Sequence, residues 1–98
     1  MSEKLNFIDL FAGCGGLSEG FYKEGYNALL HLEIDPAACK TLRTRMKHYN
    51  YSDEEIDKAV LCDDITRDGI IEEIESRLSD KVDIIIGGPP CQAFSTQG

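Results

Sequence analysis

The fold of this chain is decided by the stretch Phe7-Ile8-Asp9-Leu10-Phe11-Ala12-Gly13-Cys14-Gly15-Gly16. Residues 6–11 predict a short apolar strand, which Asp9 interrupts, and the glycines that follow end it. Residues 17–24 predict a helix, because apolar side chains recur one turn apart on one face. A strand that passes through a glycine turn into a helix is the opening unit of a parallel α/β sheet.

Strands and helices continue to alternate along the rest of the chain. Further strands are predicted at residues 28–33, 59–62 and 82–86, helices at residues 35–48 and 68–78, and a short polar turn opened by a capping box at residues 52–55. We expect an α/β, Rossmann-like fold, a parallel sheet with helices on both faces, of which these residues hold the first four strands. Strand one lies inside the sheet, with strands two and three on one side and strand four on the other. The inner face of the last helix is expected to carry Ile70, Ile71, Ile74 and Leu78.

The composition limits the classes of function. Lys and Arg total 10 while Asp and Glu total 18, so the formal net charge is −8. A surface that binds phosphates should be basic, so a nucleic-acid-binding surface is expected mostly outside these residues. No apolar run approaches the ~20 residues of a membrane helix, and no signal-peptide segment follows the N-terminus. These features predict a cytoplasmic protein without membrane contact.

Cysteine and histidine provide few candidate metal ligands. The four cysteines stand at positions 14, 39, 62 and 91, without a CxxC or CxH pair. This spacing predicts no zinc or other metal site, and all but Cys91 are expected to be small buried hydrophobic residues. His31 lies within the second strand, where we expect a core or edge residue with satisfied hydrogen bonds. No catalytic partner for His31 is evident in the sequence.

Acidic residues accompany the first two predicted strands, at the edge where such sheets bind ligands. Asp9 precedes the glycine turn and suits an ammonium group better than a pyrophosphate, and Ser18 breaks the GxGxxG spacing. The turn therefore favours a ligand with a positive head over NAD, the alternative being a structural turn with a solvated Asp9. Glu33 stands 18 residues after Gly15, which suits a carboxylate that binds two ribose hydroxyls.

Three more acidic residues, Asp35, Asp63 and Asp64, need separate interpretations. Asp35 precedes Pro36, and this order is more economically a helix cap than a ligand site. After the third strand, Asp64 can accept a hydrogen bond from an exocyclic amine while Ile65 packs against a flat base. Solvation of the loop acids is the alternative, and it is the favoured interpretation for Asp63.

The stretch Gly87-Gly88-Pro89-Pro90-Cys91-Gln92-Ala93-Phe94-Ser95 follows the fourth strand and is the most specific in the chain. Its prolines stiffen the backbone before the thiol, and its glycines allow close packing against a ligand. A single cysteine is more often structural than catalytic, but this one stands where ligand and substrate should meet. The pattern predicts that Cys91 is a nucleophile.

These stretches resemble the opening motifs of the DNA (cytosine-5-)methyltransferase family. The likeness is carried by residues 7–16 and 88–95, with Glu33-Ile34-Asp35 and Asp64-Ile65-Thr66 resembling the motifs between them in the same order. It spans residues 7–98. The resemblance implies the methyltransferase version of the Rossmann-like fold, with S-adenosylmethionine as cofactor, S-adenosylhomocysteine as product and no metal.

The resemblance also implies a role for each matching residue. The implied cofactor contacts are Asp9 at the methionine amine, Phe11, Gly13 and Gly15 along the cofactor, Glu33 at the ribose, Ile34 against the adenine, and Asp64 and Ile65 at the adenine edge, with Pro90 beside the target base. Cys91 is the implied nucleophile, whose thiolate adds to carbon 6 of cytosine and so activates carbon 5. The cytosine must leave the duplex to reach this thiol.

The family pattern extends beyond the residues given. By this resemblance, residues 1–98 are the N-terminal part of a single catalytic domain, cut after the nucleophile loop and without the target-recognition domain. We expect such a chain to be inactive alone and to leave its fourth strand as an unpaired edge. The expected partners are double-stranded DNA with a flipped cytosine and, in a bacterial cytoplasm where the enzyme works at the nucleoid, a restriction endonuclease.

Three alternatives stay open on sequence grounds. An RNA cytosine methyltransferase acting on tRNA would carry the same motifs. A non-catalytic module that only binds S-adenosylmethionine would not depend on Cys91. An NAD-dependent enzyme is disfavoured by the glycine spacing and by Asp9.

Overall fold

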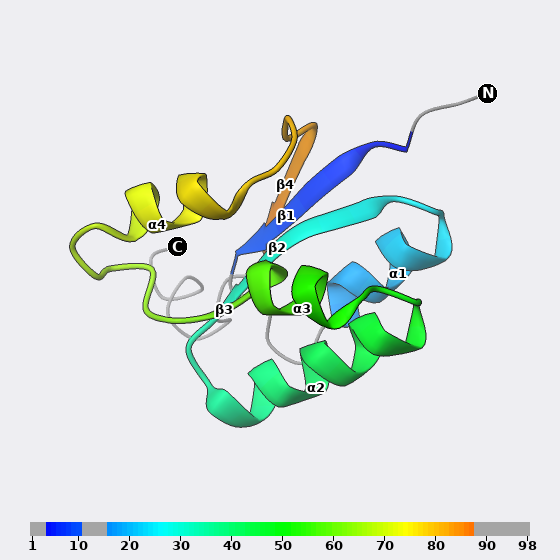
Figure 1. Ribbon diagram of the computed structural model, residues 1–98, viewed down its shortest axis with the longest axis horizontal. Coiled ribbons are helices and arrows are strands. Elements are labelled where there is room, and N and C mark those ends of the chain that lie inside the picture. The colour runs from blue at the N-terminus through cyan, green and yellow to red at the C-terminus, as the bar shows by residue number, and fades with distance from the viewer. Residues whose placement is uncertain (1–3, 11–15, 88–98) are drawn as a thin grey trace, which may run out of the picture.

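A computed structural model describes residues 4–10 and 16–87 of the chain. Its sheet contains the strands β1 (Asn6–Leu10), β2 (Asn27–Glu33), β3 (Val60–Cys62) and β4 (Ile84–Gly87). All neighbouring strands are parallel, and their order is β3-β2-β1-β4 (Figure 1). The predicted parallel α/β sheet, with strand one inside it, is therefore confirmed.

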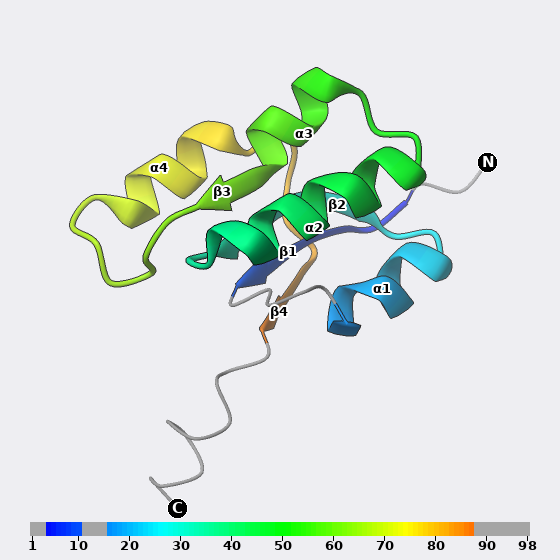
Figure 2. The same cartoon turned by 90° about the horizontal axis from the view of Figure 1, so that it is seen from below.

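Helices cover both faces of this sheet (Figure 2). They are α1 (Gly16–Lys23), α2 (Pro36–His48), α3 (Asp53–Ala59) and α4 (Ile70–Arg77). The first three share an apolar core with one sheet face, whereas α4 packs through Ile70 and Ile74 against the other. Leu42 and Met46 of α2 are fully buried in the first core, so α2 is held mainly by apolar packing.

Local capping signals explain where several helices begin and end. Gly25 adopts a left-handed φ of 88° just after α1, a conformation that favours glycine. The Asp35 side chain accepts a hydrogen bond from the Ala37 amide, with Pro36 at the first helical position. Both predicted helix boundaries agree with the structure.

The capping box at residues 52–55 opens a helix, whereas the sequence predicted only a short polar turn. The Ser52 side chain accepts from the Glu55 amide at 3.1 Å, and the Glu55 carboxylate accepts from the Ser52 amide at 2.8 Å. Burial of Ile56 and Ala59 then stabilises a seven-residue α3. Ala59, predicted to start the third strand, is consequently the last residue of this helix.

The prediction for α4 was wrong at Ile71. This side chain is 57% exposed, while Ile70 and Ile74 are buried. Side chains four apart share a helix face, and the next residue is rotated about 100° away from it. The buried stripe of α4 therefore follows Ile70 and Ile74 and leaves Ile71 outside it.

A register shift between β1 and β2 determines which side chains share a sheet face. Phe7 pairs with Ala28, but Ile8 pairs with Leu30, so Leu29 is an extra residue in β2. Beyond this irregularity Asp9 lies opposite His31.

Among the helices in the described part of the chain, none is long and apolar enough to span a membrane.

Candidate cofactor site

The carboxyl ends of the four strands meet at one edge of the sheet. Leu10, at the end of β1, is opposite Gly87 at the end of β4. A Cβ atom at Gly87 would lie 3.0 Å from the Leu10 carbonyl oxygen, so these two strand ends approach closely because Gly87 has no side chain. Glu33 and Cys62 pair at the ends of β2 and β3. This pairing brings the predicted site residues that follow β2 close to those that follow β3.

Several predicted site residues cannot be placed at this edge. Phe11, Gly13, Gly15, Pro90 and Cys91 lie outside the described residues. Their implied contacts with cofactor and target base stay predictions.

Glu33 and Ile34 form the β2 part of the candidate site. The Glu33 carboxylate accepts a hydrogen bond from the Asp35 amide at 3.0 Å, which orients the carboxyl group next to the start of α2. Ile34 is 63% exposed. An exposed isoleucine beside a carboxylate at the ligand edge offers an apolar contact to a flat base and an acceptor to hydroxyl groups. Asp35 serves as the helix cap that the sequence favoured.

Asp64 and Ile65 lie in the loop between β3 and α4. Asp64 Oδ1 accepts hydrogen bonds from the Thr66 amide at 2.9 Å and the Thr66 hydroxyl at 2.8 Å. These bonds hold the pKa of Asp64 below its usual value, because they favour the ionised carboxylate. Ile65 is partly buried against the apolar core under α4. The loop therefore holds an ionised acceptor beside a fixed apolar side chain.

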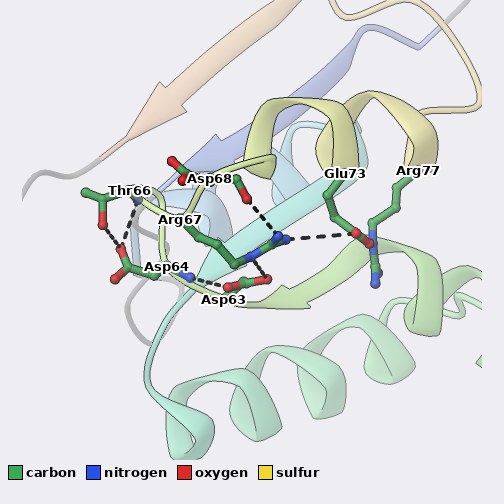
Figure 3. A network of polar contacts seen from close by, with 7 residues as sticks. All are labelled: Asp63, Asp64, Thr66, Arg67, Asp68, Glu73 and Arg77. Atoms are coloured by element: carbon green, nitrogen blue, oxygen red, sulfur yellow. Dashed lines mark hydrogen bonds and ion pairs between the residues drawn. The ribbon is translucent and has the colours of Figure 1, made fainter.

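A network of ion pairs ties this loop to α4 (Figure 3). Arg67 lies at its centre: its Nε is 2.8 Å from Asp63 Oδ2, and its guanidinium also faces Glu73. Glu73 in turn pairs with Arg77 at 2.9 Å. The favoured interpretation of Asp63 as a solvated acid was thus wrong, since its carboxylate binds Arg67 and the Asp64 amide. Glu73 and Arg77 are four residues apart within α4, a spacing that signals an ion pair on a helix, whereas Asp63 and Arg67 lie in a loop, where that spacing gives no such signal.

Asp9 is buried, with only 1% of its surface exposed. Its Oδ2 lies 3.2 Å from His31 Nδ1, and His31 Nε2 lies 2.6 Å from the Tyr22 hydroxyl. The alternative of a solvated Asp9 is therefore wrong. The expectation that His31 is a core residue with satisfied hydrogen bonds is confirmed. Its two hydrogen-bond partners, Asp9 and Tyr22, are 22 and 9 residues away in the sequence. The implied contact of Asp9 with an ammonium group stays a prediction.

Two cysteines flank the end of β2. Cys39 is buried, and its thiol donates to the Glu33 carbonyl oxygen at 3.2 Å. Burial, together with neighbouring Cys62, raises the pKa of Cys39 to about 12, so this thiol is protonated at neutral pH. Cys62 is exposed, contrary to the prediction of a buried residue, because β3 ends there at the sheet edge. Within residues 4–10 and 16–87, His, Cys, Asp and Glu form no cluster suited to a metal ion.

The comparisons with known proteins agree with this arrangement. Residues 5–98 match the model of the C-5 cytosine-specific DNA methylase family. The chain belongs to this family, as the sequence motifs predicted.

Individual relatives are type II methyltransferases. The chain is 43% identical over 97 residues to the type II methyltransferase M1.HphI of Haemophilus parahaemolyticus, covering 96% of this chain and 23% of the relative. It is 42% identical over 95 residues to M.DdeI of Desulfomicrobium norvegicum, covering 96% of this chain and 20% of that protein. A crystal structure from E. coli, assigned as a DNA modification methyltransferase encoded within a prophage, matches with a TM-score of 0.61 and 33% identity over 91% of this chain and 23% of its own. The chain thus spans about a quarter of the length of these relatives.

Proposed function

We propose that this chain supplies the first part of the cofactor site and the nucleophile of an enzyme that methylates carbon 5 of cytosine in DNA. Membership of the C-5 cytosine-specific family supports this function. The observation that carries it is the convergence of Glu33 and Ile34 with the Asp64 loop at the carboxyl edge of the sheet. Residues 1–98 then form the N-terminal part of one catalytic domain.

The described residues fit the adenosine half of S-adenosylmethionine. The Glu33 carboxylate suits the two ribose hydroxyls, and the exposed Ile34 suits one face of the adenine. Asp64, ionised and fixed by Thr66, would accept from the adenine amine. When bound, this cofactor supplies a methyl group on a positively charged sulfur.

Cys91 is the proposed nucleophile. Its thiolate would form a bond to carbon 6 of cytosine, which places electron density on carbon 5. After methylation, loss of the carbon 5 proton returns the electron pair to the ring and expels the thiolate. A free thiol with a pKa of ~8.5 is mostly protonated at neutral pH, so its surroundings must favour the thiolate.

DNA is the proposed substrate, and its main binding surface is expected on other parts of the protein. The net charge of −8 disfavours strong phosphate binding by these residues alone, because DNA contacts depend on Lys and Arg. We therefore expect the 98 residues by themselves to transfer no methyl group. We also propose a restriction endonuclease partner, in keeping with the type II names of the relatives, and a place of work at the nucleoid in the cytoplasm.

The proposed chemistry can be tested by trapping. We would incubate the complete protein with duplex DNA that contains 5-fluorocytosine and with S-adenosylmethionine, then locate the adduct by mass spectrometry. An adduct on Cys91, lost in Cys91→Ser and kept in Cys62→Ser, is expected; Cys62 provides a matched exposed thiol. No adduct despite normal cofactor binding would leave only a binding module, and transfer of tritiated methyl to tRNA but not DNA would favour the RNA enzyme.

A further inference from the structure

The loop between β3 and α4 holds Asp64 by its backbone as well as by its side chain. The Asp64 amide donates to Asp63 Oδ1 at 2.8 Å, and the Asp64 carbonyl oxygen accepts from the Arg67 amide at 3.0 Å. Both bonds from Thr66 fall on Asp64 Oδ1. Within residues 4–10 and 16–87, Asp64 Oδ2 makes no hydrogen bond. Asp64 is therefore fixed in place with this second oxygen left to accept from a ligand.

Arg67 connects the same loop to the start of α4. Its Nε donates to Asp63 Oδ2 at 2.8 Å, and the other oxygen of that carboxylate binds the Asp64 amide. Its Nη1 donates to the Asp68 carbonyl oxygen at 3.1 Å, and its own carbonyl oxygen accepts from the Ile70 amide at 3.1 Å. Figure 3 shows the Arg67 side chain between the loop acids and α4. The orientation of the Asp63 carboxylate is thus set from the helix.

The ion pair between Asp63 and Arg67 contributes little to folding. The two side chains are 25% and 40% exposed, and water screens the attraction between groups exposed to this degree. Its effect on geometry is larger, because the guanidinium limits rotation of the Asp63 carboxylate and that carboxylate holds the Asp64 amide. Loss of the pair should therefore leave the protein folded and give Asp64 more freedom to turn.

We propose that Asp63 and Arg67 are positioning residues that set how strongly the cofactor site selects a purine with a 6-amino group, through the orientation they give to Asp64. The inference rests on the proposed function, in which Asp64 accepts from the adenine amine. A hydrogen bond requires a narrow range of distance and angle, and an acceptor that must first be ordered loses part of its contribution to affinity. A mobile Asp64 weakens recognition of the amine alone, whereas a disrupted loop weakens binding of any purine.

The test compares two ligands in the complete protein by calorimetric titration. They are S-adenosylhomocysteine and its counterpart in which purine without the 6-amino group replaces adenine. The wild type should prefer the amine by about tenfold or more, the effect of one hydrogen bond to a charged acceptor. Arg67→Met removes the guanidinium and keeps the apolar stem, and Asp63→Asn leaves one acceptor oxygen in place of two. Each should lower this preference by about two- to fivefold, the range of an exposed ion pair.

Two further variants separate positioning from a general loss of charge. Arg43→Met removes another ion pair, made with Asp57 between α2 and α3, and Arg43 is 44% exposed; the preference for the amine should stay unchanged. The double variant of Asp63→Asn with Arg67→Met should lose no more preference than either single variant, because both changes remove the same bond.

The proposal is overturned if the wild type shows no preference for the amine, or if the preference is unchanged in both Asp63→Asn and Arg67→Met. It is also overturned if the affinities for the two ligands fall in parallel, if Arg43→Met lowers the preference equally, or if the losses add in the double variant. A wild-type protein that binds neither ligand would refute the proposed function itself, and the positioning role with it.

Discussion

Truncation of Ile34 tests the assignment of the adenine contact. Complete burial of an isoleucine side chain is worth about 1.5–3 kcal/mol, and 63% of Ile34 is exposed. Covering that surface with a base would therefore contribute about 1–2 kcal/mol at most. Since alanine keeps part of the contact, Ile34→Ala should weaken cofactor binding by about 1 kcal/mol, which is roughly fivefold in the dissociation constant.

Calorimetric titration of the complete protein with S-adenosylmethionine measures this effect. Ile71 offers a matched control, because it is 57% exposed on α4 and lies outside the candidate site. Ile71→Ala should leave the affinity unchanged, and neither change should lower the free energy of unfolding by more than about 0.5 kcal/mol, as is usual for surface substitutions. Ile34→Phe should tighten binding, because an aromatic ring stacks on a base. Equal affinity losses in the two alanine variants, or no loss in Ile34→Ala, would refute the placement of the adenine.

Three more predictions concern stability and pH. Ser52→Ala should lower the free energy of unfolding by about 1 kcal/mol, because it removes the α3 cap; an unchanged urea midpoint would contradict this. Leu42→Ala, at a fully buried position, should cost about 2–5 kcal/mol in the same assay, and a loss below that range would show that the surrounding core collapses into the space. The lowered pKa of Asp64 means that its bonds to Thr66 stabilise the loop above the unfolded-state pKa and are lost as the pH falls through the folded-state value. The Thr66 amide resonance should follow this acid transition in NMR, with a midpoint that rises in Thr66→Val; an identical midpoint would argue against the side-chain bond.

The helix boundaries were predictable because their signals are local, and the strand order followed from the topology rules for alternating strands and helices. Asp35 with Pro36, and Gly25, mark helix boundaries within a few residues, and the alternation of strand and helix restricts the topology. The site residues Glu33 and Asp64 could be proposed for the same reason, since each follows a strand directly.

Features that depend on distant segments could not be read in advance. The length of α3 depends on burial of Ile56 against other elements, which the capping box alone does not reveal. The partners of His31 come from β1 and α1, and the extra Leu29 in β2 changes the register by one residue. A pattern of one segment contains no information about such a pairing between segments.

The two borders of the sheet are built differently. At the β3 border, Arg77 of α4 donates to the Asp57 and Lys58 carbonyl oxygens at the end of α3, so one guanidinium joins helices that belong to opposite layers. At the β4 border, Ile85 is 65% exposed, and β1 is the neighbour to which β4 is hydrogen-bonded in the described sheet. A strand that adds beside β4 would therefore extend the described sheet on the side away from the contact between α3 and α4 at the β3 border.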